Sequence, residues 1–335
     1  MVLLGLTLLV AIASLLLTWI LRRYALRRSL IDIPNVRSSH SVPTPRGGGV
    51  AIVLCFLIAL PIGGGDEGVL LAIFGAGAGV ALLGFLDDHG HVAARWRLLG
   101  HFCAAAWALF WLGGGVPPLN VLGMTLDLGV AGYVCAAFYL VWMLNLYNFM
   151  DGIDGIASIE AISACLGACL LYWVGGFESL IVAPLLLAVA VAGFLYWNFP
   201  PARIFMGDAG SGFLGIILGL LSLQAAWVSS KLLWVWLILL GVFIVDATVT
   251  LIRRLIRGDK VYEAHRSHAY QFASRRYGRH LPVTLGVAAI NMFWLLPLAG
   301  CVVLWNVDGV LALVLAYLPL VLLAVRFHAG ELEKA

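Results

Sequence analysis

Long apolar runs follow one another along almost the whole chain, with only short polar segments between them. A helix that crosses the hydrocarbon core of a bilayer needs about 20 apolar residues. The chain is 63% hydrophobic and 11% charged, so a water-soluble fold would expose far too much apolar surface. The sequence therefore predicts an all-α polytopic membrane protein that forms one integral-membrane domain over residues 1–335, with about eleven transmembrane helices. The expected spans are residues 2–21, 47–64, 68–86, 98–113, 130–147, 156–174, 179–197, 211–228, 232–252, 283–305 and 308–326.

The distribution of positive charge predicts how these spans are oriented. If they alternate in direction, 19 of the 20 lysines and arginines fall on one face, and Lys231 is the exception. Because basic residues accumulate in cytoplasmic loops, we expect this face to be cytoplasmic and the N-terminus to lie outside. No basic residue precedes the first span, and a basic cluster from Arg22 to Arg28 follows it, which favours a retained anchor over a cleaved signal peptide.

Residues 87–97 open with two adjacent carboxylates, Asp87 and Asp88, and close with Arg95-Trp96-Arg97. Adjacent carboxylates repel each other, so the pair is favoured beside a cation or with a proton bound. A divalent metal ion, or a general-base role for one aspartate, would explain the pair. The alternative is a polar helix end with Trp96 as an interface anchor.

The segment NFMDGIDGIA, residues 148–157, places two carboxylates between two apolar runs. Asn145 and Asn148 lie three residues apart, hence on one face of a helix end, and Asp151 and Asp154 follow at the same interval. The repeated Asp-Gly pair favours a turn. A turn in which Asp154 caps the next helix is the alternative, but it leaves the other three polar residues unexplained.

The segment NFPPARIFMGDAGSG, residues 198–212, ends one apolar run with Pro200-Pro201 and starts the next near Asp208. A glycine-containing helix N-terminus binds anions readily, and the Asp208 carboxylate is a hard oxygen ligand suited to Mg²⁺. The alternative is that Asp208 is only the N-cap of the helix.

Two basic segments complete this face. Residues 37–49, RSSHSVPTPRGGG, contain Arg46 and glycines that allow close backbone approach to a ligand. Residues 253–281 hold eight basic residues. Binding of anionic lipid headgroups is the alternative for both segments. The second segment offers a phosphate clamp but a poor zinc site, and its candidate residues are His265, Arg266 and His268.

Asp246 lies inside the ninth expected span, with Thr248 and Thr250 nearby. A carboxylate within a membrane segment is a candidate functional residue by default. A hydrogen bond between two helices is the alternative.

Taken together, these segments place carboxylates, arginines and histidines on one face of the membrane. Acidic and basic groups in one place suit a Mg²⁺ ion and a polyphosphate, because the metal neutralises phosphate oxygens while the basic groups hold the rest. The residues alone therefore predict phosphoryl-group chemistry at the cytoplasmic surface.

Several motifs carry a more specific resemblance. NLYNFMDGIDG, the aspartate pair at 87–88, FMGDAGSG and HRSH resemble the polyprenyl-phosphate N-acetylhexosamine-1-phosphate transferases of glycosyltransferase family 4. The resemblance covers essentially the whole chain and is nearest to the enzymes that initiate O-antigen synthesis. It implies transfer of an N-acetylhexosamine-1-phosphate from a UDP-sugar to undecaprenyl phosphate, with release of UMP, as the first membrane step of lipopolysaccharide synthesis.

The resemblance also implies residue roles. Asp208 and Asn148 would be ligands of Mg²⁺, with Mn²⁺ as a possible substitute, and Asp154 would contact uracil. Asp87 and Asp88 would be catalytic, one of them as the base on the lipid phosphate, with Asp151 as a supporting carboxylate. The pyrophosphate or sugar would be held by the basic side chains Arg46, His265, Arg266 and His268.

Two departures from the family pattern matter for the substrate. The pentapeptide transferases of peptidoglycan synthesis carry an HHHFE-like run where this chain has HRSHAYQ, which argues against a pentapeptide substrate. Some members have a lysine soon after the aspartate pair, whereas the nearest cations here are Arg95 and Arg97.

The expected partners are undecaprenyl phosphate, a UDP-N-acetylhexosamine and membrane lipid, with no nucleic acid and with a homodimer possible. The sugar is left open between N-acetylglucosamine and a 6-deoxy relative such as N-acetylfucosamine. The expected location is the bacterial inner membrane with a cytoplasmic active site. Two other hypotheses are the pentapeptide-type transferase and a transporter of an anionic solute, although transporters place charge near the midplane.

Overall fold

The computed structural model describes residues 2–34, 39–90, 92–259 and 265–332, and helices dominate it. Apolar runs become helices because a helix satisfies its own backbone hydrogen bonds in lipid. The helices of the described residues are α1 (Val2–Arg27), α2 (Val50–Gly63), α3 (Glu67–His89), α4 (Ala94–Leu112), α5 (Ala131–Met150), α6 (Ile156–Gly175), η1 (Glu178–Leu180), α7 (Val182–Asn198), α8 (Asp208–Val228), α9 (Lys231–Leu239), α10 (Gly241–Arg257), α11 (Ala269–Tyr277), α12 (Leu281–Ile290), the π-helical turn η2 (Asn291–Leu295), α13 (Leu296–Leu304) and α14 (Gly309–Arg326).

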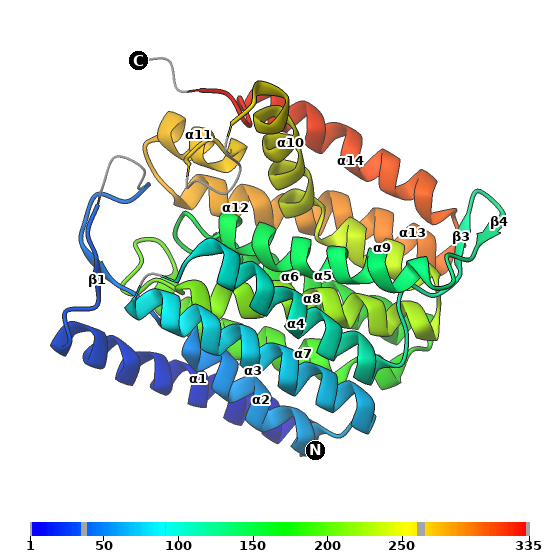
Figure 1. Cartoon of the computed structure of the whole chain (residues 1–335), viewed down its shortest axis with the longest axis horizontal. Coiled ribbons are helices and arrows are strands. Elements are labelled where there is room, and N and C mark those ends of the chain that lie inside the picture. The colour runs from blue at the N-terminus through cyan, green and yellow to red at the C-terminus, as the bar shows by residue number, and fades with distance from the viewer. Residues whose placement is uncertain (1, 35–38, 91, 260–264, 333–335) are drawn as a thin grey trace.

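Helix α8 lies at the centre of the bundle and is the most buried of the long apolar helices (Figure 1). It packs against α3 on one side and α5 on another. Small residues permit this close packing in lipid. A Cβ atom on Gly215 would lie 2.5 Å from the carbonyl oxygen of Met143 in α5, so the two backbones could not approach this closely with any larger residue.

The all-α polytopic prediction is confirmed. Among the described residues, eight helical stretches are long and apolar enough to cross a membrane by length and composition, or nine if the bent pair α9 and α10 counts as one span. Two of the eight join adjacent helices, namely η1 with α7 and α12 with η2 and α13. The other two expected spans correspond to α2, which has 14 residues, and to α4, which has 19 residues but does not meet the same criteria. The count of eleven and the orientation of the chain remain predictions.

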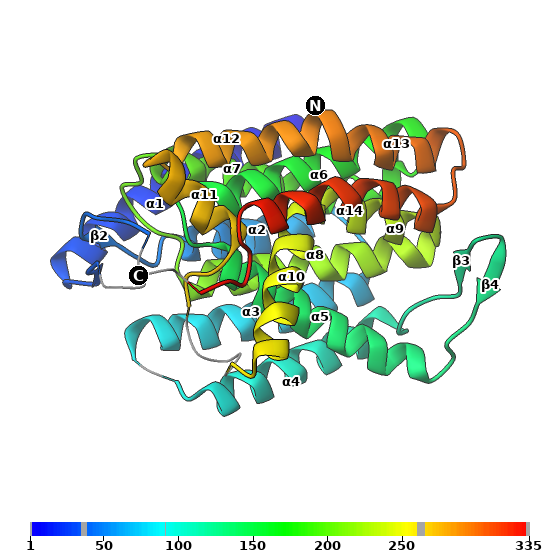
Figure 2. The same cartoon turned by 90° about the horizontal axis from the view of Figure 1, so that it is seen from above.

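The ninth expected span, residues 232–252, is not one straight helix. Helices α9 and α10 meet at Leu240 with a bend of 74°, and α10 crosses the direction of the neighbouring helices (Figure 2). The bend turns α10 across the bundle, where it contacts α11.

Two short hairpins mark opposite ends of the bundle (Figures 1 and 2). One consists of β1 (Ile31–Asp32) and β2 (Thr44–Pro45), with Ile31 paired to Pro45. The other consists of β3 (Leu119–Val121) and β4 (Met124–Leu126). The first hairpin lies at the same end as α11, and the polar segments identified in the sequence gather there.

Candidate active site

A cavity of about 390 Å³ opens at the end of the bundle near the β1–β2 hairpin. It brings together seven of the ten site residues expected from the sequence: Arg46, Asp88, Asn148, Asp151, Asp154, Asp208 and His265. Asp87 lines a smaller adjoining pocket that also includes Asn148 and Asp208. Arg266 and His268 do not line the cavity.

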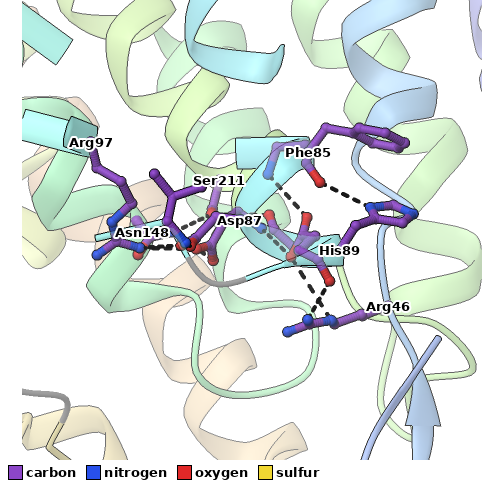
Figure 3. Close-up of polar contacts among 12 residues, drawn as sticks. Arg46, Phe85, Asp87, His89, Arg97, Asn148 and Ser211 are labelled. Atoms are coloured by element: carbon purple, nitrogen blue, oxygen red, sulfur yellow. Dashed lines mark hydrogen bonds and ion pairs between the residues drawn. The ribbon is translucent and has the colours of Figure 1, made fainter. Parts of the chain in front are cut away.

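Asp208 is the first residue of α8, and its carboxylate lies between an amide and a guanidinium. The Asn148 Nδ2 donates to Asp208 Oδ1 at 3.0 Å and to Ser211 Oγ at 2.9 Å. On the other side, Arg97 Nη1 lies 3.5 Å from Asp208 Oδ2. Figure 3 shows Asn148, Ser211 and Arg97 gathered around this point. The end of α5 and the start of α8 thus bring the Asn148 amide and the Asp208 carboxylate to the same place.

Asp87 and Asp88 face different partners. Asp87 accepts a hydrogen bond from the Val92 backbone N–H at 2.9 Å and forms an ion pair with Arg97. Asp88 is 5% exposed, and its two oxygens accept from the backbone N–H groups of Asp208 and Ala209 at 3.2 and 3.3 Å. Asp88 therefore caps the N-terminus of α8, where the helix dipole favours a negative charge.

Arg46 joins the β1–β2 hairpin to this centre. Its guanidinium donates to the backbone carbonyl of Asp88, and its Nε lies 4.0 Å from Asp88 Oδ1. Arg46 thus lines the cavity, and its contacts with Asp88 hold its guanidinium there.

A glycine allows α3 to touch the start of α8. A Cβ atom on Gly84 would lie 2.5 Å from the Ala209 nitrogen and 2.6 Å from the Asp208 carbonyl oxygen. Real Cβ atoms essentially never come within 3.0 Å of another heavy atom. The absence of a side chain at Gly84 therefore brings the aspartate pair, one turn further along α3, next to Asp208.

Asp151 is the C-cap residue of α5, and it lines the cavity. Burial raises the pKa of Asp151 well above its usual range, and the nearby charges of Asp208, Asp88 and Asp154 raise it further. A cation bound among these carboxylates would offset that repulsion.

Asp154 is held by groups on two other segments. Its Oδ2 accepts from the Ala202 N–H at 3.0 Å, and its Oδ1 lies 3.1 Å from Nδ1 of His280. The other ring nitrogen of His280 lies 2.9 Å from the Ser39 carbonyl oxygen. Asp154 also borders a second cavity of about 520 Å³, shared with Ser39 and His280.

Both capping alternatives raised by the sequence are wrong. The N-cap of α6 is Gly155, with no side-chain hydrogen bond to the cap, so Asp154 does not cap that helix. The N-cap of α8 is Gly207, and Asp208 is already inside the helix. The carboxylate that caps α8 comes from Asp88 on α3 instead.

The three candidate residues of the HRSH segment, His265, Arg266 and His268, lie in different surroundings. His265 lines the cavity and stacks on His268, with ring centroids 4.9 Å apart. His268 is buried behind it, and the Arg266 carbonyl accepts from Arg275. Burial, together with the charges of His268 and Arg254, lowers the pKa of His265 to about 3. At neutral pH, His265 can therefore act as a hydrogen-bonding imidazole and not as a cation.

The donor set at Asp208 and Asn148 fits Mg²⁺. Mg²⁺ is commonly bound by one or two carboxylates, waters and substrate phosphates, without a complete protein cage. Within the described ranges, no group of three or more His, Cys, Asp or Glu side chains is arranged to hold a metal. Rotation of the Asn148 amide would present its oxygen beside Asp208 Oδ1, which would give two hard oxygen ligands facing an open cavity.

Three site residues were not identified from the sequence: Arg97, Ser211 and His280. Ser211 follows Asp208 by three residues, so helical spacing could have placed both on one face. Arg97 and His280 were only two cations among several in basic segments, and no spacing distinguishes them. Their contacts with Asp87 and Asp154 arise from tertiary structure.

Comparison with known proteins finds a matching family and several relatives. The model of the family described as glycosyl transferase family 4 matches residues 70–226. A probable undecaprenyl-phosphate N-acetylglucosaminyl 1-phosphate transferase of Bacillus subtilis is 30% identical over 76% of this chain and 73% of its own length. An undecaprenyl-phosphate alpha-N-acetylglucosaminyl 1-phosphate transferase of Thermotoga maritima is 28% identical over 86% of this chain and 88% of its own length. A phospho-N-acetylmuramoyl-pentapeptide-transferase of Streptococcus thermophilus is 26% identical over 74% of this chain and 72% of its own length.

Proposed function

The chain belongs to glycosyl transferase family 4, the polyprenyl-phosphate N-acetylhexosamine-1-phosphate transferases, and from this premise we propose that it transfers an N-acetylhexosamine-1-phosphate from a UDP-sugar to undecaprenyl phosphate. The observation that best supports this proposal is that one pocket is lined by Asp87, Asn148 and Asp208. In the reaction, an oxygen of the lipid phosphate attacks the β-phosphorus of the UDP-sugar. The bond from that phosphorus to the bridging oxygen breaks, and UMP leaves.

Mg²⁺, when bound by Asp208 and Asn148, would supply positive charge to the pyrophosphate oxygens. The protein's own groups do the rest. Asp87 is the base that keeps the attacking lipid phosphate deprotonated, and Arg97 holds that carboxylate in position. Asp88 fixes the start of α8, and therefore Asp208, by accepting its backbone N–H groups.

The nucleotide half of the substrate is assigned to the side of the cavity near Asp154. Its carboxylate is oriented by His280 and the Ala202 N–H, which suits a contact with the uracil edge. Arg46 and His265 line the same cavity and are assigned to the pyrophosphate and sugar. His265 contributes hydrogen bonds there, because its pKa lies well below neutral pH.

We also propose a cellular location and a pathway step for this reaction. The chain would act in the inner membrane of a bacterium, with this cavity on the cytoplasmic face, as the 19-to-1 distribution of basic residues favours. The product would start O-antigen or another cell-surface polysaccharide, and the protein would be able to work as a homodimer.

The substrate is tested with purified protein in lipid nanodiscs. The protein is given Mg²⁺, undecaprenyl phosphate and each of several donors, and released UMP is measured. The donors are UDP-N-acetylglucosamine, UDP-N-acetylgalactosamine, a UDP-linked N-acetylated 6-deoxy sugar and UDP-MurNAc-pentapeptide. We expect UMP with one or more UDP-N-acetylhexosamines, and no UMP with any of them would refute the proposal. UMP from the pentapeptide donor alone would instead support the peptidoglycan reaction, which the Streptococcus thermophilus relative keeps open.

The proposed metal ligand is tested by Asp208→Asn, which keeps the shape of the side chain and removes its charge. We expect UMP release to fall at least about 100-fold, the usual effect of losing one group that stabilises transition-state charge. Asp127→Asn is the control, because Asp127 is exposed near the β3–β4 hairpin at the opposite end of the bundle, and it should stay within about twofold of the wild type. Full Mg²⁺-dependent turnover by Asp208→Asn would remove Asp208 from the metal site.

A further inference from the structure

Asp246 is a buried carboxylate that the proposed reaction does not use. It lies in α10, the half of the bent pair that runs across the bundle, and it is 6% exposed. A buried charge of this kind is costly unless it is fully hydrogen-bonded. Its partners therefore indicate what keeps it there.

The carboxylate of Asp246 binds the N-terminus of a different helix. Its Oδ1 accepts from the Ala269 N–H at 2.9 Å, and its Oδ2 accepts from the Tyr270 N–H at 3.0 Å. These are the first two residues of α11, whose free N–H groups and dipole favour a negative charge. Thr250, one turn along α10, also donates to Oδ1 at 3.2 Å.

The same carboxylate orients a histidine ring. Nδ1 of His268 lies 3.3 Å from Asp246 Oδ1, within hydrogen-bonding distance of the carboxylate. The Nε2 atom of His268 is buried and has no hydrogen-bond partner within the described part of the chain. The ring is therefore held from the Asp246 side, and its outer face stacks on His265, which lines the cavity.

Further contacts connect the start of α11 to the reaction centre. The Tyr270 hydroxyl donates to the Phe149 carbonyl at 3.0 Å, next to the proposed ligand Asn148. Gln271 lines the cavity and accepts from the His268 N–H at 3.1 Å. A shift of the α11 N-terminus would therefore move His265 and Gln271 with it.

From these contacts we propose that Asp246 is a positioning residue, which anchors the first turn of α11 and the His268 ring so that His265 faces the substrate cavity. The effect on turnover rests on the proposed transferase function. The anchoring of α11 does not, and it can be measured separately.

The test uses full-length protein in nanodiscs and the variant Asp246→Asn, with Thr250→Val as the matched control. Asn keeps the size of the side chain but turns an NH₂ group toward one of the N–H donors. We expect amide hydrogen exchange in the peptide covering 265–277 to rise at least about tenfold, and kcat for UMP release to fall at least about tenfold. Thr250→Val removes a partner of Asp246 but no contact with α11, so both quantities should stay within about twofold of the wild type.

A double-mutant cycle shows whether Asp246 acts through His268. His268→Gln removes the ring from Asp246, and adding it to Asp246→Asn should cause little further loss of kcat. If the losses of kcat from the two substitutions instead multiply in the double variant, Asp246 does not act through His268. Amide exchange at the wild-type rate in Asp246→Asn would also overturn the proposal. If Asp246→Asn does not fold, the proposal is tested with His268→Gln alone. Turnover by His268→Gln within about twofold of the wild type would then overturn it. If the wild type releases no UMP from any donor, the proposed function fails while the exchange measurement still tests the anchor.

Discussion

Both ring nitrogens of His280 face oxygen atoms, one on Asp154 and one on the Ser39 carbonyl. Burial lowers the pKa of His280, but the hydrogen bond and charge of Asp154 outweigh it, so the pKa lies above the ordinary value of 6.5. The protonated ring therefore stabilises the fold fully below pH 6.5. This contribution is lost as the pH rises through the higher pKa of the folded state.

We predict that His280→Gln lowers the thermal midpoint at pH 6 and has a smaller effect at pH 9. A partly buried, charge-assisted hydrogen bond contributes about 1–2 kcal/mol, and this gap between wild type and variant should close as the pH rises. His328→Asn is the control, because His328 pairs with Glu331 in an exposed position, where such pairs contribute little. A gap that is equal at both pH values would contradict the assigned charge of His280.

The aspartate pair shows what residue types alone could predict. The sequence indicated that Asp87 and Asp88 belong to a polar site, because two adjacent carboxylates at a membrane surface need partners. It could not indicate how the two differ. The difference depends on Arg97 and on the first N–H groups of α8, and α8 begins 120 residues after Asp88 in the chain. The charge state of His265 could not be predicted from the sequence either, since it depends on how deeply the ring is buried.

At the scale of elements, the contact between α3 and the start of α8 determines the site geometry. We predict that Gly84→Ala reduces both stability and turnover, because its Cβ would clash with backbone atoms that cannot rotate away. Overpacking of this kind costs about 1–3 kcal/mol, and the displaced α3 would carry Asp87 and Asp88 away from Asp208. Thermal midpoint and UMP release are the two measurements.

Gly79→Ala is the matched control on the same helix. A Cβ placed there would meet nothing within 4 Å in the described part of the chain, and replacing a helical glycine with alanine generally stabilises by about 0.5–1 kcal/mol. Turnover should be unchanged in this variant. If both alanines behave alike, close packing at Gly84 is not what fixes the aspartate pair.

For the whole molecule, the helical architecture was predictable because runs of about 20 apolar residues have few other stable forms in a bilayer. The bend at Leu240 was not, because the residues on both sides of Leu240 are apolar and hydropathy does not distinguish a bent helix from a straight one. The bend nevertheless directs Asp246 toward α11. The part of the site that depends on α10 therefore follows from packing between distant segments.

A buried polar pair joins α6 and η2 inside the apolar bundle. Glu160 of α6 and Asn291 of η2 are 0% and 3% exposed, and Asn291 Nδ2 donates to Glu160 Oε2 at 2.6 Å. We predict that Asn291→Leu destabilises the protein by about 1–3 kcal/mol, since it leaves a buried acidic group without its donor. The measurement is the thermal midpoint in nanodiscs.

The double variant Glu160→Leu with Asn291→Leu should melt closer to the wild type than Asn291→Leu does, because replacing both members of a buried polar pair with apolar residues is often neutral or stabilising. Asn120→Leu, at an exposed position in β3, should shift stability by no more than about 0.5 kcal/mol. If the double variant instead melts below both Asn291→Leu and the wild type, the hydrogen bond between Glu160 and Asn291 stabilises the protein beyond satisfying these two buried groups. The contact between α6 and η2 would then be needed to hold the bundle around the bent pair α9 and α10.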